Sequence, residues 1–251
     1  MAVEKNYTPG VGQGSVSFMA ARTAQSHAAF VLPELRAGMS ILDLGCGPGT
    51  ITVGLAEAVA PGTVLGIDQG EQQLADARAL GDQQGLANVA FKTGSCYQLP
   101  LADGSVDLVF AHALIEHLGE PMRALAEVRR VLRPGGLAAL CSPDWGGFIL
   151  SPPTAAIESA VREYTSLMES NGGDPAAGRR LGVYLADSGF GDIRVDARYE
   201  KYPDPTVVAS YLAAQLAAAG RDESAEAFRD WAAEPSAVFA QTWVSAIGVR
   251  N

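Results

Sequence analysis

Short apolar runs alternate with longer stretches of helical periodicity between residues 39 and 143. The run at residues 41–44, interrupted only by Asp43, is typical of a central parallel strand, because both faces of such a strand are covered. The pattern predicts, in order, strand 39–45, helix 50–60, strand 63–68, helix 69–85, strands 88–95 and 105–114, helix 122–136 and strand 137–143. This alternation predicts an α/β fold with a parallel sheet and helices on both faces.

The second part of the chain interrupts the alternation. Helical patterns rich in aromatic residues fill most of residues 146–190 and 203–235, and the segments 192–202 and 237–249 read as strands. The two late strands are expected to pair antiparallel at the end of the sheet. Helices inserted at the carboxyl edge of a sheet commonly cover a ligand, so 146–190 and 203–235 are predicted to form a helical lid.

Composition narrows the class of ligand. The chain has 251 residues, a hydrophobic fraction of 48%, a charged fraction of 18% and a formal net charge of −10. These values are typical of a single globular domain spanning 1–251, with an N-terminal cap at 1–38 and a core at 39–145. Nucleic-acid phosphates require clustered Lys and Arg, so the acidic charge argues against a nucleic-acid partner.

Neither a membrane span nor a secretory leader is expected. No apolar run reaches the roughly 20 residues that cross a bilayer, and no basic segment precedes an apolar one near the start. Cys46, Cys96 and Cys141 are isolated in the sequence, and this spacing predicts no disulfide framework and no metal site. We therefore expect a cytoplasmic protein, monomeric or homodimeric, in which the cysteines are small buried residues.

The glycine-rich turn GCGPG at residues 45–49 follows the first predicted strand. A dinucleotide-binding turn has the spacing G-x-G-x-x-G, which directs a helix N-terminus at a pyrophosphate. Here the third glycine comes one residue early. Asp43 also places a carboxylate beside the turn, which disfavours a diphosphate and favours a ligand that carries an ammonium group. The alternatives are a tight turn without a ligand, and an Asp43 that caps the following helix.

Asp68 ends the second strand, 25 residues after Asp43. Ligands of parallel sheets bind beyond the carboxyl ends of the strands, where the strand order reverses, so both carboxylates are expected beside one ligand. A carboxylate at Asp68 can accept hydrogen bonds from both hydroxyls of a ribose. A ribose together with a cation, and no required phosphate, describes S-adenosylmethionine.

Four segments in this order resemble the successive motifs of class I S-adenosylmethionine-dependent methyltransferases: LDLGCGPGT, VLGID, LPLADGSVDLVFAHALIEHL and EVRRVLRPGG. The resemblance covers residues 15–145 and is closest to the small-molecule branch that includes the ubiquinone and menaquinone biosynthesis methyltransferases. It implies a Rossmann-like, seven-stranded, mostly parallel sheet with helices on both faces and an inserted helical lid.

The resemblance also implies where the cofactor binds. Asp43 and the turn after it would face the methionine part, Asp68 the ribose and Gln69 the adenine. At the third loop the family commonly has an acidic residue, where this chain has Ser95, a weaker acceptor for the adenine amino group. The full set of expected cofactor contacts is Arg22, Asp43, Gly45, Cys46, Gly47, Asp68, Gln69, Ser95, Cys96 and His112.

The acceptor of the methyl group would approach from the side of the N-terminal cap and the lid. The expected acceptor contacts are Tyr7, Trp145, Phe148, Tyr184 and Tyr202. A base would help an acceptor that carries a proton, and the candidates are Tyr7, His112 and His117. A structural role in starting or packing a helix is favoured for the pair formed by Glu116 and His117.

These residues predict methyl transfer to a small-molecule acceptor through an oxygen, nitrogen or carbon nucleophile, with an aromatic or isoprenoid acceptor among the options. Positioning and desolvation would supply much of the rate, because the sulfonium already activates the methyl group. The alternatives are an RNA or protein methyltransferase and a non-catalytic protein that binds S-adenosylmethionine.

Overall fold

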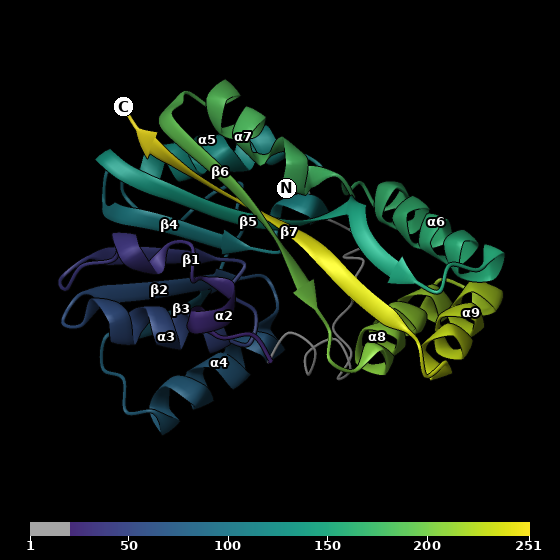
Figure 1. Ribbon diagram of the computed structural model, residues 1–251. Helices are drawn as coiled ribbons and strands as arrows, with labels where there is room; N and C mark the ends of the chain where they lie inside the picture. Colours follow the sequence, from purple (N-terminus) through teal and green to yellow (C-terminus); the bar gives the residue numbers. More distant parts are fainter. Residues whose placement is uncertain (1–20) are drawn as a thin grey trace.

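The computed structural model describes residues 21–251, which are arranged around one seven-stranded sheet (Figure 1). Its strands are β1 (Ser40–Leu44), β2 (Thr63–Asp68), β3 (Val89–Thr93), β4 (Val106–His112), β5 (Leu132–Ser151), β6 (Phe190–Lys201) and β7 (Val238–Arg250). They lie in the order β3-β2-β1-β4-β5-β7-β6. The strands β1 to β5 run parallel, and β7 runs antiparallel to both of its neighbours. The predicted Rossmann-like fold is therefore confirmed, including its antiparallel end.

Helices cover both faces because the central strands are apolar on both sides. Ile41 of β1 belongs to the hydrophobic cluster on one face of the sheet, and Leu42 belongs to the cluster on the other face, because successive side chains of a strand point to opposite faces. One face carries α2 (Ala24–His27), α3 (Thr50–Val59) and α4 (Glu71–Gln83), and the other carries α5 (Pro121–Val131) and α7 (Ala177–Asp187). Two short 3-10 helices, η1 (Leu32–Glu34) and η2 (Ile115–His117), complete the core.

The lid has a hydrophobic core of its own. The helices α6 (Ala155–Ser170), α8 (Pro205–Ala218) and α9 (Asp222–Ala233) gather around the far ends of β5 and β7 (Figure 1). Phe228 of α9 and Phe239 of β7 are fully buried there. The lid is thus held by packed apolar side chains and by the continuation of two sheet strands, which fixes it over one end of the sheet.

The lid boundaries differ from the expected segment 146–190. Residues 146–151 continue β5, because antiparallel pairing with β7 resumes at Ile149 after an irregularity that begins at Asp144. The helix α7 packs on the sheet, with Leu181 and Leu185 buried in the same cluster as α5.

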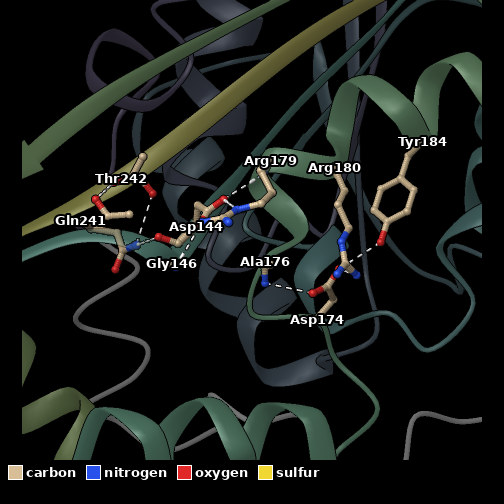
Figure 2. A network of polar contacts seen from close by, with 10 residues as sticks. Asp144, Gly146, Asp174, Ala176, Arg179, Arg180, Tyr184, Gln241 and Thr242 are labelled. Carbon is tan, nitrogen blue, oxygen red and sulfur yellow. Dashed lines mark hydrogen bonds and ion pairs between the residues drawn. The ribbon is translucent and has the colours of Figure 1, made fainter. Parts of the chain in front are cut away.

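A polar network fixes α7 to β5 (Figure 2). The guanidinium of Arg179 donates to both carboxylate oxygens of Asp144, at 2.6 and 2.7 Å, and the Gly146 amide donates to one of them at 2.8 Å. Burial would raise the pKa of Asp144, but these hydrogen bonds outweigh it and hold that pKa below its usual value. Asp144 is therefore an anchor between strand and helix.

Candidate active site

The turn after β1 requires glycine at three positions. Gly45, Gly47 and Gly49 have φ angles of 75°, 51° and 77°, in the left-handed region that side chains disfavour. A Cβ on Gly49 would lie 2.7 Å from the Cβ of Ala77 in α4, so this glycine also permits the close packing of two helices. The amides of Gly45 and Cys46 donate to the Ile67 carbonyl of β2. The turn is thereby bound to the neighbouring strand and exposes its backbone at the strand-order reversal between β1 and β4.

Asp68 joins two of the loops. Its carboxylate accepts hydrogen bonds from the amide of Gly47 at 2.9 Å and the amide of Gly70 at 2.8 Å. Each carboxylate oxygen has a second lone pair, so two further donors can bind. Asp68 therefore both shapes the site and keeps the capacity to bind a pair of hydroxyl groups.

Asp43 is a buried carboxyl group at the base of the same turn. It accepts a 2.6 Å hydrogen bond from the Thr52 hydroxyl. Burial, opposed in part by that hydrogen bond and assisted by the charge of Asp68, raises the pKa of Asp43 to about 7. A ligand ammonium group nearby would favour the ionised form.

Three neighbouring cavities share lining residues at the carboxyl ends of the strands. One of about 250 Å³ lies between the ends of β1, β2 and β4 and is lined by Gly45, Asp68, Gln69, Gly70, Cys96 and Leu114, among others. A second lies over the glycine turn, against Asp43, Thr50 and His112. A third, of about 50 Å³, lies under the lid. Ala113 lines all three.

Ala113 follows β4 directly and has a φ of 53°, which is strained for a residue with a Cβ. Its amide donates to the Cys141 carbonyl of β5, which fixes this conformation. Strained backbone of this kind is concentrated at functional sites. The junction of the three cavities is therefore a rigid point of the sheet.

The cavity under the lid is built mainly from large side chains of distant elements. Its lining is Arg22, Ala113, Glu116, His117, Pro143, Trp145, Tyr164, Tyr202, Val208, Tyr211, Leu212, Gln241 and Trp243. Trp145 packs on Tyr164 with ring centroids 4.8 Å apart. The guanidinium carbon of Arg22 lies 5.4 Å from the centroid of the Trp243 ring. The cavity joins the cap, the sheet and the lid.

Glu116 brings a buried carboxyl group to this cavity. Its side chain accepts a 2.8 Å hydrogen bond from the Ser142 hydroxyl, and its other oxygen lies 3.7 Å from Nε2 of His117. Burial raises the pKa of Glu116 to about 7, whereas burial and the charge of Arg22 lower the pKa of His117 to about 3. His117 is therefore neutral near pH 7, and Glu116 is poised between its two protonation states.

His112 lies on the other side of the junction. Its ring stacks on Trp243 at a centroid distance of 4.6 Å and meets the ring of His27 edge-on at 5.0 Å. Neither ring nitrogen has a hydrogen-bond partner within residues 21–251. Burial, with the nearby charge of Arg22 and the ring of His27, lowers the pKa of His112 well below its usual value. The imidazole is therefore neutral.

Comparison with known proteins identifies the family. The family described as "Methyltransferase domain" matches residues 35–178, more than half of the chain. A trans-aconitate 2-methyltransferase of Deinococcus radiodurans is 32% identical over 190 residues, which cover 74% of this chain and 70% of that protein. The chain belongs to the class I S-adenosylmethionine-dependent methyltransferases. S-adenosylmethionine is the cofactor of this family.

Two further comparisons bear on length and fold. An uncharacterised 37.1 kDa protein in transposon TN4556 of Streptomyces fradiae is 39% identical over 171 residues, covering 66% of this chain but 48% of that protein. The methyltransferase chain thus spans about half the length of that relative. A structure of a SAM-dependent methyltransferase from Aquifex aeolicus has a TM-score of 0.60, with 19% identity and coverage of 96% of this chain and 100% of that chain. At this identity the likeness concerns the fold.

The methyltransferase structure brings together nine of the ten predicted cofactor residues. Arg22, Asp43, Gly45, Cys46, Gly47, Asp68, Gln69, Cys96 and His112 line the two cavities at the ends of β1, β2 and β4. Ser95 does not line them; its hydroxyl accepts a hydrogen bond from the Tyr97 amide within its own turn. The backbone of the third loop reaches the cavity instead, through Gly94 and Cys96.

The predicted acceptor residues are only partly brought together. Trp145 and Tyr202 line the cavity under the lid, and so does the candidate base His117. Phe148 lies beyond Trp145, in a separate groove of about 370 Å³ beside α6. Tyr184 is on α7, and its hydroxyl donates to Asp174 at 3.0 Å, away from the cavity (Figure 2). Tyr7 lies outside the described residues.

Several residues of the site were not predicted in their roles. Gln73, from the first turn of α4, lines both of the cavities at the ends of β1, β2 and β4. Gln241 and Trp243 reach the lid cavity from β7, where their spacing of two places them on one face of the strand. Glu116 gave a signal in the sequence, an acid next to a histidine after β4, but its burial and its Ser142 partner appear only in the fold.

Within the described residues, none of the helices has the length and apolar character needed to cross a bilayer.

Proposed function

We propose that this methyltransferase transfers the methyl group of S-adenosylmethionine to a small-molecule acceptor held in the cavity under the lid. The observation that carries the proposal is Ala113, which lines the two cavities that would hold the cofactor and also the aromatic cavity under the lid. A relative named trans-aconitate 2-methyltransferase is, by its name, specific for a small molecule. Both features favour a small acceptor over a macromolecule.

The residues at the first two cavities fit the cofactor. Asp68 would hold the ribose hydroxyls, and Asp43 the amino group of the methionine part, with the backbone of the glycine turn close by. Arg22, at the edge of the same cavity, would pair with the methionine carboxylate. When bound, S-adenosylmethionine supplies a methyl group made electrophilic by its sulfonium.

The chain's own contribution to the reaction would be orientation, exclusion of water and removal of a proton. Trp145, Tyr164 and Trp243 would pack against the acceptor and exclude water. Glu116 would accept the proton that a hydroxyl or neutral amine nucleophile loses when its bond to carbon forms. The pKa of about 7 suits Glu116 to this role better than His117, whose pKa of about 3 makes it a weak base.

The test is incubation of the purified protein with labelled S-adenosylmethionine and a panel of metabolites that carry hydroxyl, amine or carboxylate groups. We expect label in at least one small molecule, with Asp68→Ala as the negative control. Label in tRNA, DNA or protein, and in no metabolite, would contradict the proposed acceptor class. Binding of the cofactor without any label transfer would favour a non-catalytic binding protein.

A further inference from the structure

The strand β6 forms an edge of the sheet. Within residues 21–251 it pairs with β7 alone, and this pairing is regular from Arg194 to Lys201 after an irregularity between Gly191 and Arg194. The peptide groups on its outer side are therefore available to another strand. Most side chains of this regular segment are exposed, so the edge is not covered by a described element.

The side chains of this edge alternate in charge. Arg194, Asp196, Arg198 and Glu200 follow at intervals of two and therefore lie on one face of the strand. On the other face, Val195 is 55% exposed and Tyr199 is 57% exposed, although both are large and apolar in character. The outer strand thus presents a row of alternating charges and a pair of uncovered apolar groups.

This pattern is complementary to itself in one register. If a second copy pairs antiparallel about a two-fold axis normal to the sheet, residues of the same face oppose one another. With the axis at Ala197, Arg194 opposes Glu200 of the second copy and Asp196 opposes Arg198. Val195 then opposes Tyr199, so the two exposed apolar groups cover each other.

The neighbouring registers are disfavoured. An axis one residue earlier places Asp196 opposite its own copy and Arg194 opposite Arg198. An axis one residue later places Arg198 opposite its own copy and Asp196 opposite Glu200. Like charges directly opposed across strands are destabilising. Two further attractive registers lie two residues away. The one centred on Val195 would run into Asp192, whose φ of 45° breaks the regular strand. The one centred on Tyr199 would need pairing beyond Lys201, where the strand ends.

We propose that the protein forms a homodimer in which β6 of two copies pairs antiparallel about Ala197, joining two seven-stranded sheets into one. The side chains of Arg194 and Arg198 are 60% and 44% exposed, and so can reach across the new pair. Within its own chain Arg194 contacts Glu34 at 2.8 Å, and Glu200 lies 3.4 Å from Nε2 of His27 and 3.8 Å from Arg198. The pairing of Arg194 with the second copy's Glu200 would be added to these contacts. The interface is independent of the methyl acceptor.

Light scattering after size exclusion tests the dimer. The unaltered protein should have twice the chain mass of 26.1 kDa, and Arg198→Asp should have the mass of one chain, because both central pairs become repulsive. The double variant Asp196→Arg/Arg198→Asp restores opposite charges across the axis and should restore the dimer. A single-chain mass for the unaltered protein at every concentration, or a dimer that persists in Arg198→Asp, would overturn the proposal.

A pair of cysteine variants tests the register. Ala197→Cys places two thiols directly opposite each other, so mild oxidation should give a covalent dimer. Val195→Cys is the matched control, because in this register its two thiols are four residues apart along the strands, about 13 Å, and should not join. The native cysteines 46, 96 and 141 are buried and give little background. Equal crosslinking of both variants, or preferential crosslinking of Val195→Cys, would contradict the assigned register.

Discussion

The two halves of the proposed active site differ in what lines them: backbone in the proposed cofactor half and side chains in the proposed acceptor half. The cofactor half, at the ends of β1, β2 and β4, consists largely of backbone turns, held by left-handed glycines and by the carboxylate of Asp68. The acceptor half, under the lid, consists of large side chains from β5, α6, α8, β7 and the cap. A site lined by backbone atoms depends on the conformation of its turns, and so it keeps binding the same ligand when side chains change. A site lined by side chains can bind a different ligand after a few substitutions. The family can therefore keep one cofactor and vary its acceptors.

The largest loss of stability is expected where the turn after β1 requires glycine, a residue without a side chain. Gly49→Ala should lower the free energy of unfolding by about 2–4 kcal/mol, through left-handed strain and the 2.7 Å approach to Ala77. Gly47→Ala is the matched control: it also has a positive φ, but the nearest atom to its Cβ is 3.8 Å away. Gly47→Ala should lower the free energy of unfolding by only about 1 kcal/mol. Equal losses in urea unfolding of the two variants would show that helix packing does not set the turn.

The next effect concerns the buried acid of the acceptor half. The pKa of Glu116 rises from its usual 4.5 to about 7 on folding, so the folded state binds the proton more tightly than the unfolded state. The stabilisation from this proton is fully present below pH 4.5 and is lost as the pH rises to about 7. The loss in the free energy of unfolding is up to about 3 kcal/mol.

Urea unfolding between pH 4.5 and 8 measures this contribution. Glu116→Gln should flatten the decline without abolishing it, because Asp43 titrates in the same direction, from 3.8 to about 7. An unchanged pH dependence in Glu116→Gln would mean that Glu116 is already ionised in the fold, and would remove it as the poised base.

A smaller effect separates the two halves kinetically. Trp145→Ala should raise the KM of the acceptor, or lower turnover, by the equivalent of about 1–3 kcal/mol, because an apolar wall of the cavity is lost. Phe148→Ala should have less effect, since that ring lines the outer groove. Steady-state kinetics with the labelled acceptor compares them. A larger defect in Phe148→Ala would place the acceptor in the groove.

The smallest effect tests a residue that the sequence assigned to the acceptor. Tyr184→Phe removes one hydrogen bond to Asp174 and should lower the free energy of unfolding by about 1 kcal/mol or less. Acceptor kinetics should not change, because α7 packs on the sheet. A marked rise in acceptor KM would mean that Tyr184 reaches the cavity after all.

The same contrast explains how much could be predicted from the sequence. The strands of the core and the glycine turn follow from local signals: apolar runs, helix stops and the spacing of Asp43 and Asp68. The seven-stranded sheet was expected from the family resemblance. Nine of ten cofactor residues therefore come together in the structure. Ser95 was the exception, because its hydroxyl bonds within its own turn.

The acceptor half could not be predicted in this way. Trp243 and Gln241 lie about 100 residues after Trp145, and only the pairing of β7 with β5 brings them to the same cavity. Phe148 and Tyr184 are aromatic, as pocket residues often are, but Phe148 lies within the irregularity of β5 and the Tyr184 hydroxyl donates to Asp174. Sequence periodicity shows which face of a strand or helix a residue occupies. It does not show which element from a distant part of the chain packs against that face.

The central claim is that the two halves are separable, and calorimetric titration of S-adenosylmethionine into three proteins tests it most directly. Asp68→Ala should weaken cofactor binding by about 2 kcal/mol or more, roughly 30-fold, because the ribose loses a charged acceptor. Trp145→Ala should bind the cofactor with nearly the affinity of the unaltered protein. Unchanged affinity in a folded Asp68→Ala, or an equal loss in both variants, would contradict the account, as would tight binding of NAD in place of S-adenosylmethionine.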